Sequence, residues 1–342
     1  MMAAKRKICV TGPMRIKLAE KMLREADCEL VLGKPQDDFR DFRYQRKELI
    51  DLIGDCSIVY PSGRDTIGGD ILDSCPELQA VVKSSIGIET VDVDAATDLG
   101  ILCCNSPTVE NYMGVAEATM GLIVSLFKRL KLNETVIRNG GWKELQHRGT
   151  LMLGKTVGII GVGRIGQNVA KRLGAWGMKV LGYDPYVKQE TVASLGVKMV
   201  SLEELLKQSD LITVHVVLTR ETRGMLGMRE FKMMKPTAFI VNTSRGQALK
   251  ETELVEALNE NIIAAAALDV FEREPLPLNS PLRQVDPLRL ILTPHNIGAN
   301  PGSAEAGQRM AADSMLAILD GRIPDTIVNP LAIPRWKERF WS

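Results

Sequence analysis

The chain has 342 residues, a length typical of two globular domains. It carries 43 lysine and arginine residues against 42 aspartate and glutamate residues, so its net charge of +1 predicts no nucleic-acid partner and no anionic membrane surface. The hydrophobic fraction of 45% is that of a globular protein, and no apolar run reaches the roughly 18 residues of a membrane helix. The opening residues, MMAAKRKICVTG, lack the apolar stretch of a secretory signal, so we expect a cytoplasmic protein.

The scarce residues argue against a disulfide framework and a metal centre. All six cysteines precede residue 105 without C-x-x-C spacing, which predicts reduced, buried side chains. The three histidines, His147, His215 and His295, are far apart in the sequence, and no H-E-x-x-H pattern occurs. No bound metal is predicted.

The first hundred residues alternate short apolar runs with helical patterns. Strands are predicted over residues 7–10, 29–32, 57–60, 80–83 and 101–104. This alternation is typical of βαβ units, which form a parallel sheet with helices on its faces. One long helix is then predicted from Glu110 to Leu132; because it is apolar on more than one face, it is either a core element or a subunit contact.

A second alternation follows the glycine-rich bend at residues 139–142. Strands are predicted over residues 156–160, 179–183, 211–215, 238–242, 264–270 and 290–293, with helices at 164–175 and 251–259 between them. This is a second doubly wound sheet. A last helix, residues 302–321, either closes this domain or returns to the first, and the pattern favours neither. The tail RWKERFWS is predicted to be solvent-exposed or to contact another subunit.

Two glycine-rich motifs match phosphate-binding patterns. Residues 149–156, GTLMLGKT, fit the P-loop string, but a P-loop must follow a strand and open a helix, whereas here a polar stretch precedes the motif and a strand follows it. Residues 161–166, GVGRIG, directly follow a predicted strand and lead into a predicted helix. In the dinucleotide fingerprint, Gly161 permits the tight turn, Gly163 the approach of the pyrophosphate and Gly166 the packing of helix on strand.

The next strand ends at Asp184, about where the fingerprint requires an acidic residue. Its carboxylate can accept hydrogen bonds from the adenosine ribose hydroxyls, whereas a 2′-phosphate would meet its negative charge. The sequence therefore predicts NAD as the cofactor, in preference to NADP.

Polar residues follow later strands of the same sheet, where open α/β sheets bind their ligands. His295 follows residues 290–293 and has the ordinary pKa of a general acid near neutral pH. Glu274 would stabilise its imidazolium form, and Arg245 can hold a carboxylate bidentately and polarise the adjacent carbonyl. His215 is the competing histidine, and it either lines the cofactor site or has a buried structural role. Hydride transfer between NAD and a carbonyl needs such a proton donor and such a cation.

GVGRIG with Asp184, HVVLT, NTSRG, DVFEREP and TPH, in this order, resemble the D-isomer-specific 2-hydroxyacid dehydrogenases. The resemblance implies an NAD-binding Rossmann domain, residues 106–297, inserted into a flavodoxin-like substrate domain, residues 1–105 and 298–342. It implies a homodimer formed through the long helix after Glu110, and a catalytic set of Arg245, Glu274 and His295. Its further cofactor contacts are Arg164, Ile165, Thr243, Ser244, Asp269 and Gly298, besides the fingerprint glycines, Asp184, His215, Arg245 and His295.

The resemblance also implies a substrate site. The loop KSSIG matches the family segment whose backbone N–H groups hold the substrate carboxylate, so Ser85, Ile86 and Gly87 join Arg245 and His295 there. Departures at Val217, Asn296 and Asn300 leave the identity of the 2-hydroxy or 2-keto acid open. The alternative function is an NAD(H)-sensing binding protein, because the family includes transcriptional corepressors; an intact catalytic set argues against it.

Overall fold

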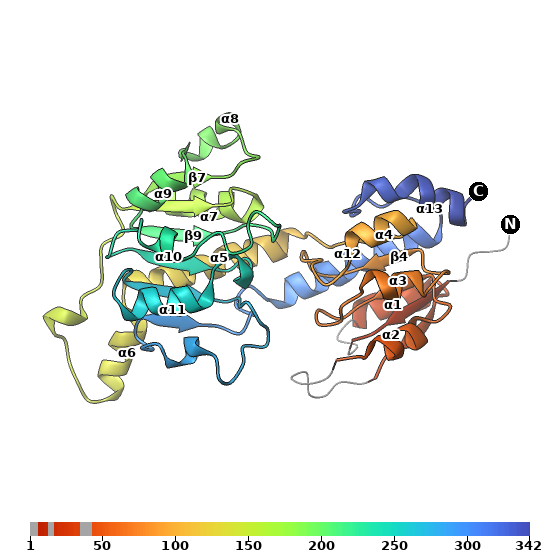
Figure 1. Ribbon diagram of the computed structural model, residues 1–342, viewed down its shortest axis with the longest axis horizontal. Coiled ribbons are helices and arrows are strands. Elements are labelled where there is room, and N and C mark those ends of the chain that lie inside the picture. The colour runs from red at the N-terminus through yellow and green to blue at the C-terminus, as the bar shows by residue number, and fades with distance from the viewer. Residues whose placement is uncertain (1–5, 13–16, 35–42) are drawn as a thin grey trace. The chain divides into compact units, whose positions relative to one another are not determined.

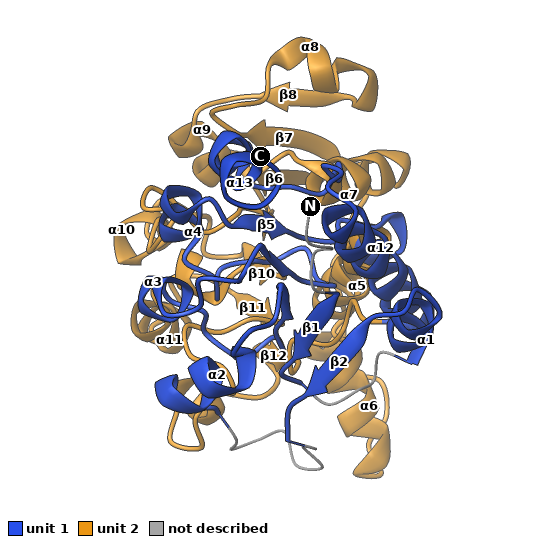
Figure 2. Ribbon diagram, turned by 90° about the vertical axis from the view of Figure 1, so that its right-hand side faces the viewer, with its two compact units in different colours: residues 1–111, 300–342 blue, residues 112–299 orange. Residues whose placement is uncertain are grey.

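The computed structural model describes residues 6–12, 17–34 and 43–342, and the chain divides into two compact units (Figures 1 and 2). Unit 1 comprises Met1–Asn111 and Asn300–Ser342, and unit 2 comprises Tyr112–Ala299. Sequence reasoning put the corresponding boundaries near residues 105 and 297. Unit 2 is thus continuous in the sequence, while unit 1 is assembled from both ends of the chain.

Unit 1 contains a parallel sheet of five strands in the order β2-β1-β3-β4-β5, which is the flavodoxin-like order. The strands are β1 (Lys7–Val10), β2 (Glu29–Leu32), β3 (Ile58–Tyr60), β4 (Ala80–Val82) and β5 (Leu102–Cys104). The helices are α1 (Lys17–Glu25), α2 (Arg46–Ile53), α3 (Gly69–Asp73), α4 (Val93–Leu99), α12 (Pro301–Leu319) and α13 (Ile333–Phe340). All five predicted strands are present, within a residue of their predicted bounds.

Alternating strand residues of this sheet enter two different cores. Ile8 and Val10 pack with α1, α12 and α13, whereas Cys9 packs with α2, α3 and α4. All six cysteines are free and buried, as expected. The helix that begins at Pro301 therefore returns to unit 1, and its N-cap Asn300 accepts a hydrogen bond from the Ser303 N–H at 2.8 Å.

The prediction that the C-terminal tail is exposed holds for its charged residues and is wrong for Trp336. The residues of the tail form most of α13, which packs on the sheet of unit 1, and the Trp336 side chain is fully buried in that core. Trp341 lies 5.9 Å from Trp336, ring centroid to centroid, and against the turn at Gly321. Aromatic residues spaced among charged residues indicate an amphipathic helix. The tail is too short for this pattern to be clear from the sequence.

Unit 2 contains a parallel sheet of seven strands in the order β12-β11-β10-β9-β6-β7-β8, which is the Rossmann order. The strands are β6 (Thr156–Ile160), β7 (Lys179–Tyr183), β8 (Val197–Met199), β9 (Leu211–Val214), β10 (Phe239–Asn242), β11 (Ala265–Leu268) and β12 (Leu290–Leu292). Its helices are α6 (Leu130–Arg138), α7 (Arg164–Ala175), α8 (Gln189–Val192), α9 (Leu202–Gln208), α10 (Met228–Phe231) and α11 (Glu251–Asn259), together with most of α5 (Val109–Phe127). Strand β8, at the sheet edge, was not predicted because its three residues carry too little pattern.

The long helix predicted from Glu110 to Leu132 is in fact two helices. α5 ends at Phe127 and α6 begins at Leu130, because Arg129 between them has a left-handed φ of 50°. The apolar side chains of α5, from Ala116 to Phe127, belong to the core that α7 and one face of the sheet complete. α5 is therefore a core element of unit 2.

Candidate active site

The carboxyl ends of six strands of unit 2 lie in one row of the sheet. Ile160 pairs in register with Tyr183 and Val214, and the row continues through Asn242, Leu268 and Leu292. The residue after each strand end therefore lies along a single edge of the sheet, in spatial order Asp184, Gly161, His215, Thr243, Asp269 and Thr293. Of these six, only Thr293 was not proposed as a site residue from the sequence.

The fingerprint glycines differ in what a side chain would meet. Gly161 has a φ of 90°, and a Cβ there would lie 2.5 Å from the His215 carbonyl oxygen. A Cβ on Gly166 would lie 2.2 Å from the Gly161 carbonyl oxygen, so helix and turn are in direct backbone contact. At Gly163 a Cβ would meet open space. This leaves an open approach to the N-terminus of α7, where Arg164 and Ile165 begin the helix and where a helix dipole favours a pyrophosphate.

Asp184 is attached to the same loop. Its Oδ2 accepts a hydrogen bond from the Val162 N–H at 2.9 Å, and its Oδ1 accepts one from the Tyr186 N–H at 2.9 Å. Each oxygen has a second lone pair with which to accept a ribose hydroxyl. An open helix N-terminus beside a fixed carboxylate fits a dinucleotide with an unmodified ribose.

His215 remains neutral under ordinary conditions. Its Nε2 lies 2.9 Å from the Thr213 hydroxyl, and its Nδ1 is buried without a partner among the described residues. Burial lowers the pKa of this imidazole to about 3. His215 therefore cannot supply a proton at neutral pH, although its Nδ1 can still bond to a ligand at this edge.

The turn after β10 fixes the backbone of Arg245. Asn242 Oδ1 accepts hydrogen bonds from the Ser244 N–H (3.0 Å) and hydroxyl (2.8 Å), and Asn242 Nδ2 donates to the Arg245 carbonyl (2.8 Å). The Arg245 side chain is half-buried, and its Nη1 donates to the Ser244 carbonyl at 2.6 Å. One asparagine thus closes the turn that presents the arginine.

Helix α5 supplies a further contact to this turn. The Thr119 and Thr243 hydroxyl oxygens lie 2.8 Å apart in a buried position, and Thr119 also donates to the Val115 carbonyl at 2.8 Å. Because the single Thr119 proton is used on a carbonyl, Thr243 is the donor to Thr119. The Thr243 oxygen is left as an acceptor. Sequence reasoning missed Thr119; its only signal is a hydroxyl among the apolar residues on the buried side of α5.

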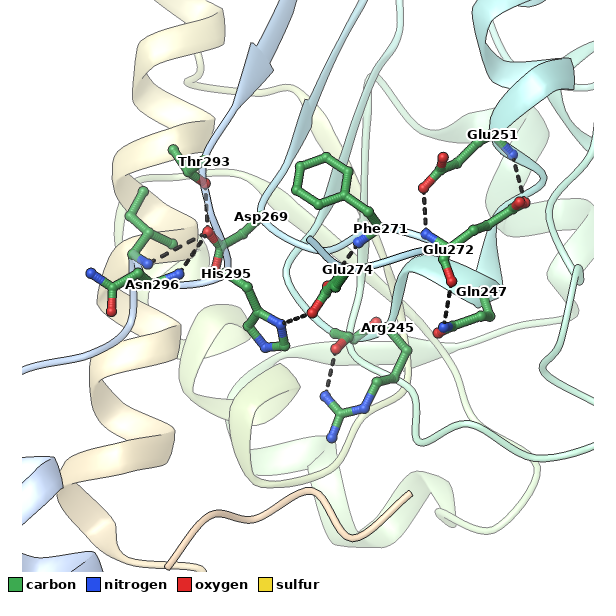
Figure 3. Close-up of polar contacts among 12 residues, drawn as sticks. Arg245, Gln247, Glu251, Asp269, Phe271, Glu272, Glu274, Thr293, His295 and Asn296 are labelled. Carbon is green, nitrogen blue, oxygen red and sulfur yellow. Dashed lines mark hydrogen bonds and ion pairs between the residues drawn. The ribbon is translucent and has the colours of Figure 1, made fainter. Parts of the chain in front are cut away.

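His295 and Glu274 form the charged pair of the site (Figure 3). His295 Nδ1 lies 2.7 Å from Glu274 Oε2, while Glu274 Oε1 accepts a hydrogen bond from the Phe271 N–H at 3.0 Å. The hydrogen bond to Glu274 raises the pKa of His295 despite partial burial, and the charges of Glu274 and Asp269 act in the same direction. Burial favours the neutral form of Glu274, but the bond to His295, its charge and the Phe271 N–H together lower the pKa of this carboxyl. The protonated imidazole is therefore stabilised near neutral pH.

Asp269 holds the segment that bears His295. Its buried Oδ1 accepts hydrogen bonds from the Thr293 hydroxyl (2.6 Å) and from the Asn296 N–H (3.2 Å). His295 itself has a left-handed φ of 52°. Anchors on both sides of the histidine keep it in this uncommon conformation. Shortly after it, Gly298 has no room for a side chain, because a Cβ would lie 2.7 Å from Val115 Cγ2.

The predicted carboxylate-binding loop lies in unit 1, after β4. The Asn105 side chain donates to the Ile86 carbonyl at 2.8 Å, and the Ser106 N–H donates to the Ser85 carbonyl at 2.9 Å. By contrast, the backbone N–H groups of residues 84–87 have no acceptor within the described parts of the chain. Consecutive unpaired N–H groups are typical of an anion-binding loop.

The P-loop string at residues 149–156 finds no support in the structure. Residues 149–156 precede β6 and open no helix, and Leu151 and Leu153 are exposed, so this stretch lacks P-loop geometry. Among the described residues, no group of three or more His, Cys, Asp or Glu side chains could hold a metal ion. In the same residues no helix is both long and apolar enough to cross a bilayer.

Comparison with known proteins points to one family. The D-isomer specific 2-hydroxyacid dehydrogenase NAD binding domain matches residues 120–296. D-3-phosphoglycerate dehydrogenase of Methanocaldococcus jannaschii is 36% identical over 97% of this chain, which spans only 61% of that relative's length. Glyoxylate reductase of Thermofilum pendens is 36% identical over 90% of each chain. The structure of D-lactate dehydrogenase from Aquifex aeolicus with NAD and lactic acid is similar with a TM-score of 0.84 and 27% identity, over 94% of this chain and 99% of that one.

Proposed function

The chain belongs to the D-isomer-specific 2-hydroxyacid dehydrogenase family, and from this we propose that it interconverts a small 2-keto acid and the corresponding D-2-hydroxy acid. The observation that carries the proposal is the His295–Glu274 pair, 2.7 Å apart, at the sheet edge that also bears the dinucleotide loop. We assign the cofactor to unit 2 and the substrate-binding loop to unit 1.

The chemistry divides between cofactor and protein. The loop at residues 161–166 and Asp184 would hold NAD, whose reduced form would supply a hydride and whose oxidised form would accept one. During reduction His295 donates its Nε2 proton to the oxygen of the substrate carbonyl, because its Nδ1 is occupied by Glu274. Glu274 stabilises the imidazolium form before the transfer and fixes the tautomer after it. In the oxidative direction the neutral imidazole accepts the proton of the hydroxyl.

Two groups of N–H donors bind the substrate in this proposal. The guanidinium of Arg245 holds the carboxylate and polarises the adjacent carbonyl through charge-assisted hydrogen bonds. Within unit 1, the backbone N–H groups of residues 84–87 are a second set of donors suited to a carboxylate. Both contributions select a 2-keto acid over a simple ketone or aldehyde, because only the acid offers an anion next to the reacting carbon.

A substrate screen tests the activity. NADH oxidation is followed with glyoxylate, hydroxypyruvate, pyruvate, phosphohydroxypyruvate and branched or aromatic 2-keto acids. We expect turnover with at least one of them, and stereochemical analysis of the product should give the D isomer. Tight NADH binding without turnover of any of these acids would instead favour the NAD(H)-sensing function, which the intact Arg245–Glu274–His295 set now argues against.

We propose that the protein is a cytoplasmic homodimer. The homodimer is supported by exposed apolar side chains in α6 and in the segment after it: Leu130, Ile137, Trp142, Leu145, Leu151 and Leu153. They are a better candidate for the subunit contact than α5, whose apolar residues are buried within unit 2. Light scattering should give twice the chain mass of 37.7 kDa. The double substitution Ile137→Glu and Leu145→Glu should shift it toward the monomer.

A further inference from the structure

The loop that carries Glu274 is hydrogen-bonded to the start of α11. Glu272 Oε1 accepts a hydrogen bond from the Glu251 N–H at 2.9 Å, and Glu251 Oε1 accepts one from the Glu272 N–H in return. Gln247 Nε2 adds a third bond, to the Glu272 carbonyl, at 2.9 Å. Figure 3 shows these residues grouped beside Glu274, on the side away from His295. The loop is therefore held from behind by the segment that follows Arg245.

Backbone packing reinforces these bonds. A Cβ on Gly246 would lie 1.9 Å from the carbonyl carbon of Phe271, so the two backbones are in direct contact. Phe271 in turn donates its N–H to Glu274 Oε1 at 3.0 Å. The relative positions of Arg245, which precedes Gly246, and Glu274 are consequently fixed by the same few residues.

This arrangement has an electrostatic cost. Three glutamates, Glu251, Glu272 and Glu274, lie close together. Burial raises the pKa of Glu251, and the charges of Glu272 and Glu274 act in the same direction. Like charges brought together in a partly buried place destabilise the folded state. Such conflicts with local stability are expected where a functional geometry must be maintained.

We propose that Glu251 and Glu272 form a reciprocal clamp that positions Glu274 against His295. The two glutamates are positioning residues, since neither contacts His295. The inference rests on the proposed function for the meaning of His295, but the clamp itself is a property of the protein without substrate. The charged groups that act on the imidazole are Glu274, Asp269 and Arg245, and the clamp controls the first of them.

The direct test is a histidine NMR titration, which is simple because the chain has only three histidines. In Glu272→Ala the loop loses the Glu251 N–H as an anchor, and we expect the pKa of His295 to fall toward that of a free histidine. Above neutral pH, kcat for reduction should fall about tenfold as the protonated fraction decreases, while the Kd for NADH stays within about twofold.

Two further variants separate positioning from charge and from stability. Glu272→Gln removes the charge but keeps an oxygen acceptor, so the pKa of His295 should remain at its wild-type value. Glu253→Ala is the matched control. Glu253 lies on α11, as Glu251 does, but its Oε2 accepts a hydrogen bond from the Met228 N–H at 2.5 Å, away from the Glu274 loop. It should affect stability alone.

Two results would overturn the clamp: an unchanged His295 pKa in Glu272→Ala, or an equal fall in Glu272→Gln. If Glu272→Ala does not fold, Glu251→Ala removes the other half of the clamp and should lower the same pKa. Because the titration needs no turnover, it remains decisive even if the wild-type protein reduces none of the keto acids. An inactive wild type would contradict the proposed function, and the clamp would still stand or fall on the His295 pKa.

Discussion

Glu274 Oε2 lies 2.7 Å from His295 Nδ1, and its second oxygen accepts the Phe271 N–H at 3.0 Å. The carboxylate is therefore fixed at both oxygens, and only one imidazole nitrogen remains for substrate. In the proposed reaction, Glu274 sets which nitrogen transfers the proton and over which pH range.

Replacing His295 by alanine should lower kcat by about 100-fold or more, the usual contribution of a general acid. The measurement is steady-state NADH oxidation with the best keto acid from the screen. NADH affinity, measured by fluorescence titration, should change only a few-fold. A rate near that of the wild type would assign the proton donor elsewhere.

The pH dependence follows from the pair. Because the pKa of His295 is raised, the imidazolium is present below that pKa, together with the stabilisation that it gains from Glu274. Both are lost as pH rises through that pKa. The lowered pKa of Glu274 means that its contribution is lost only as pH falls through that value. Reduction should therefore decline at high pH and oxidation at low pH, with a common midpoint. In Glu274→Gln the high-pH decline of kcat/KM should begin at lower pH, and an unshifted profile would contradict the pairing.

Asp184→Ala should weaken the preference for NAD. The substitution removes the ribose acceptor, the negative charge and the bonds to the Val162 and Tyr186 N–H groups. Loss of charged hydrogen bonds costs about 1.5–3 kcal/mol, so the ratio of kcat/KM for NADH over NADPH should fall about ten- to hundredfold. Parallel assays with the two cofactors give this ratio, and a constant ratio would mean that another residue excludes the 2′-phosphate.

Thr119→Val should weaken NADH binding without touching the cofactor site directly. The Thr243 hydroxyl would lose its buried acceptor, at a cost of about 1–3 kcal/mol, and the turn that leads to Arg245 would lose its anchor on α5. The Kd for NADH is expected to rise several-fold. Thr119→Ser keeps the hydroxyl and should restore the wild-type Kd. If serine behaves as valine does, the methyl group and not the hydrogen bond is responsible.

Trp336→Ala should destabilise unit 1 by about 3–5 kcal/mol, because it empties the centre of a packed core. Urea unfolding measures the loss. Trp176→Ala, at a residue that is 47% exposed, is the control and should change the free energy of unfolding by about 0.5 kcal/mol or less. Similar losses in the two variants would mean that α13 is not held by the core.

The sequence was most informative where pattern and chemistry coincide. Apolar runs placed eleven of the twelve strands among the described residues, and both sheet orders agree with the fold that the motifs implied. The contacts that hold the site were not predictable in this way. The Thr119–Thr243 bond joins residues 124 positions apart, and the exchange between Glu251 and Glu272 depends on where two backbones meet. Neither leaves a periodic signal. Trp336 was misjudged because its burial depends on a sheet formed by the first hundred residues.

Unit 1 is built from two separate segments of the chain, and this affects how the chain folds as it is synthesised. Its sheet is translated first, yet α12 and α13, which cover one face of that sheet, are translated last. Unit 2 is continuous and lies between the two parts of unit 1, so its last residue, Ala299, is translated just before α12 begins at Pro301. While unit 2 is translated, one apolar face of the first sheet therefore has α1 but lacks α12 and α13. We expect the inserted unit to mature first, and the nascent N-terminal segment to be the part that depends on chaperones.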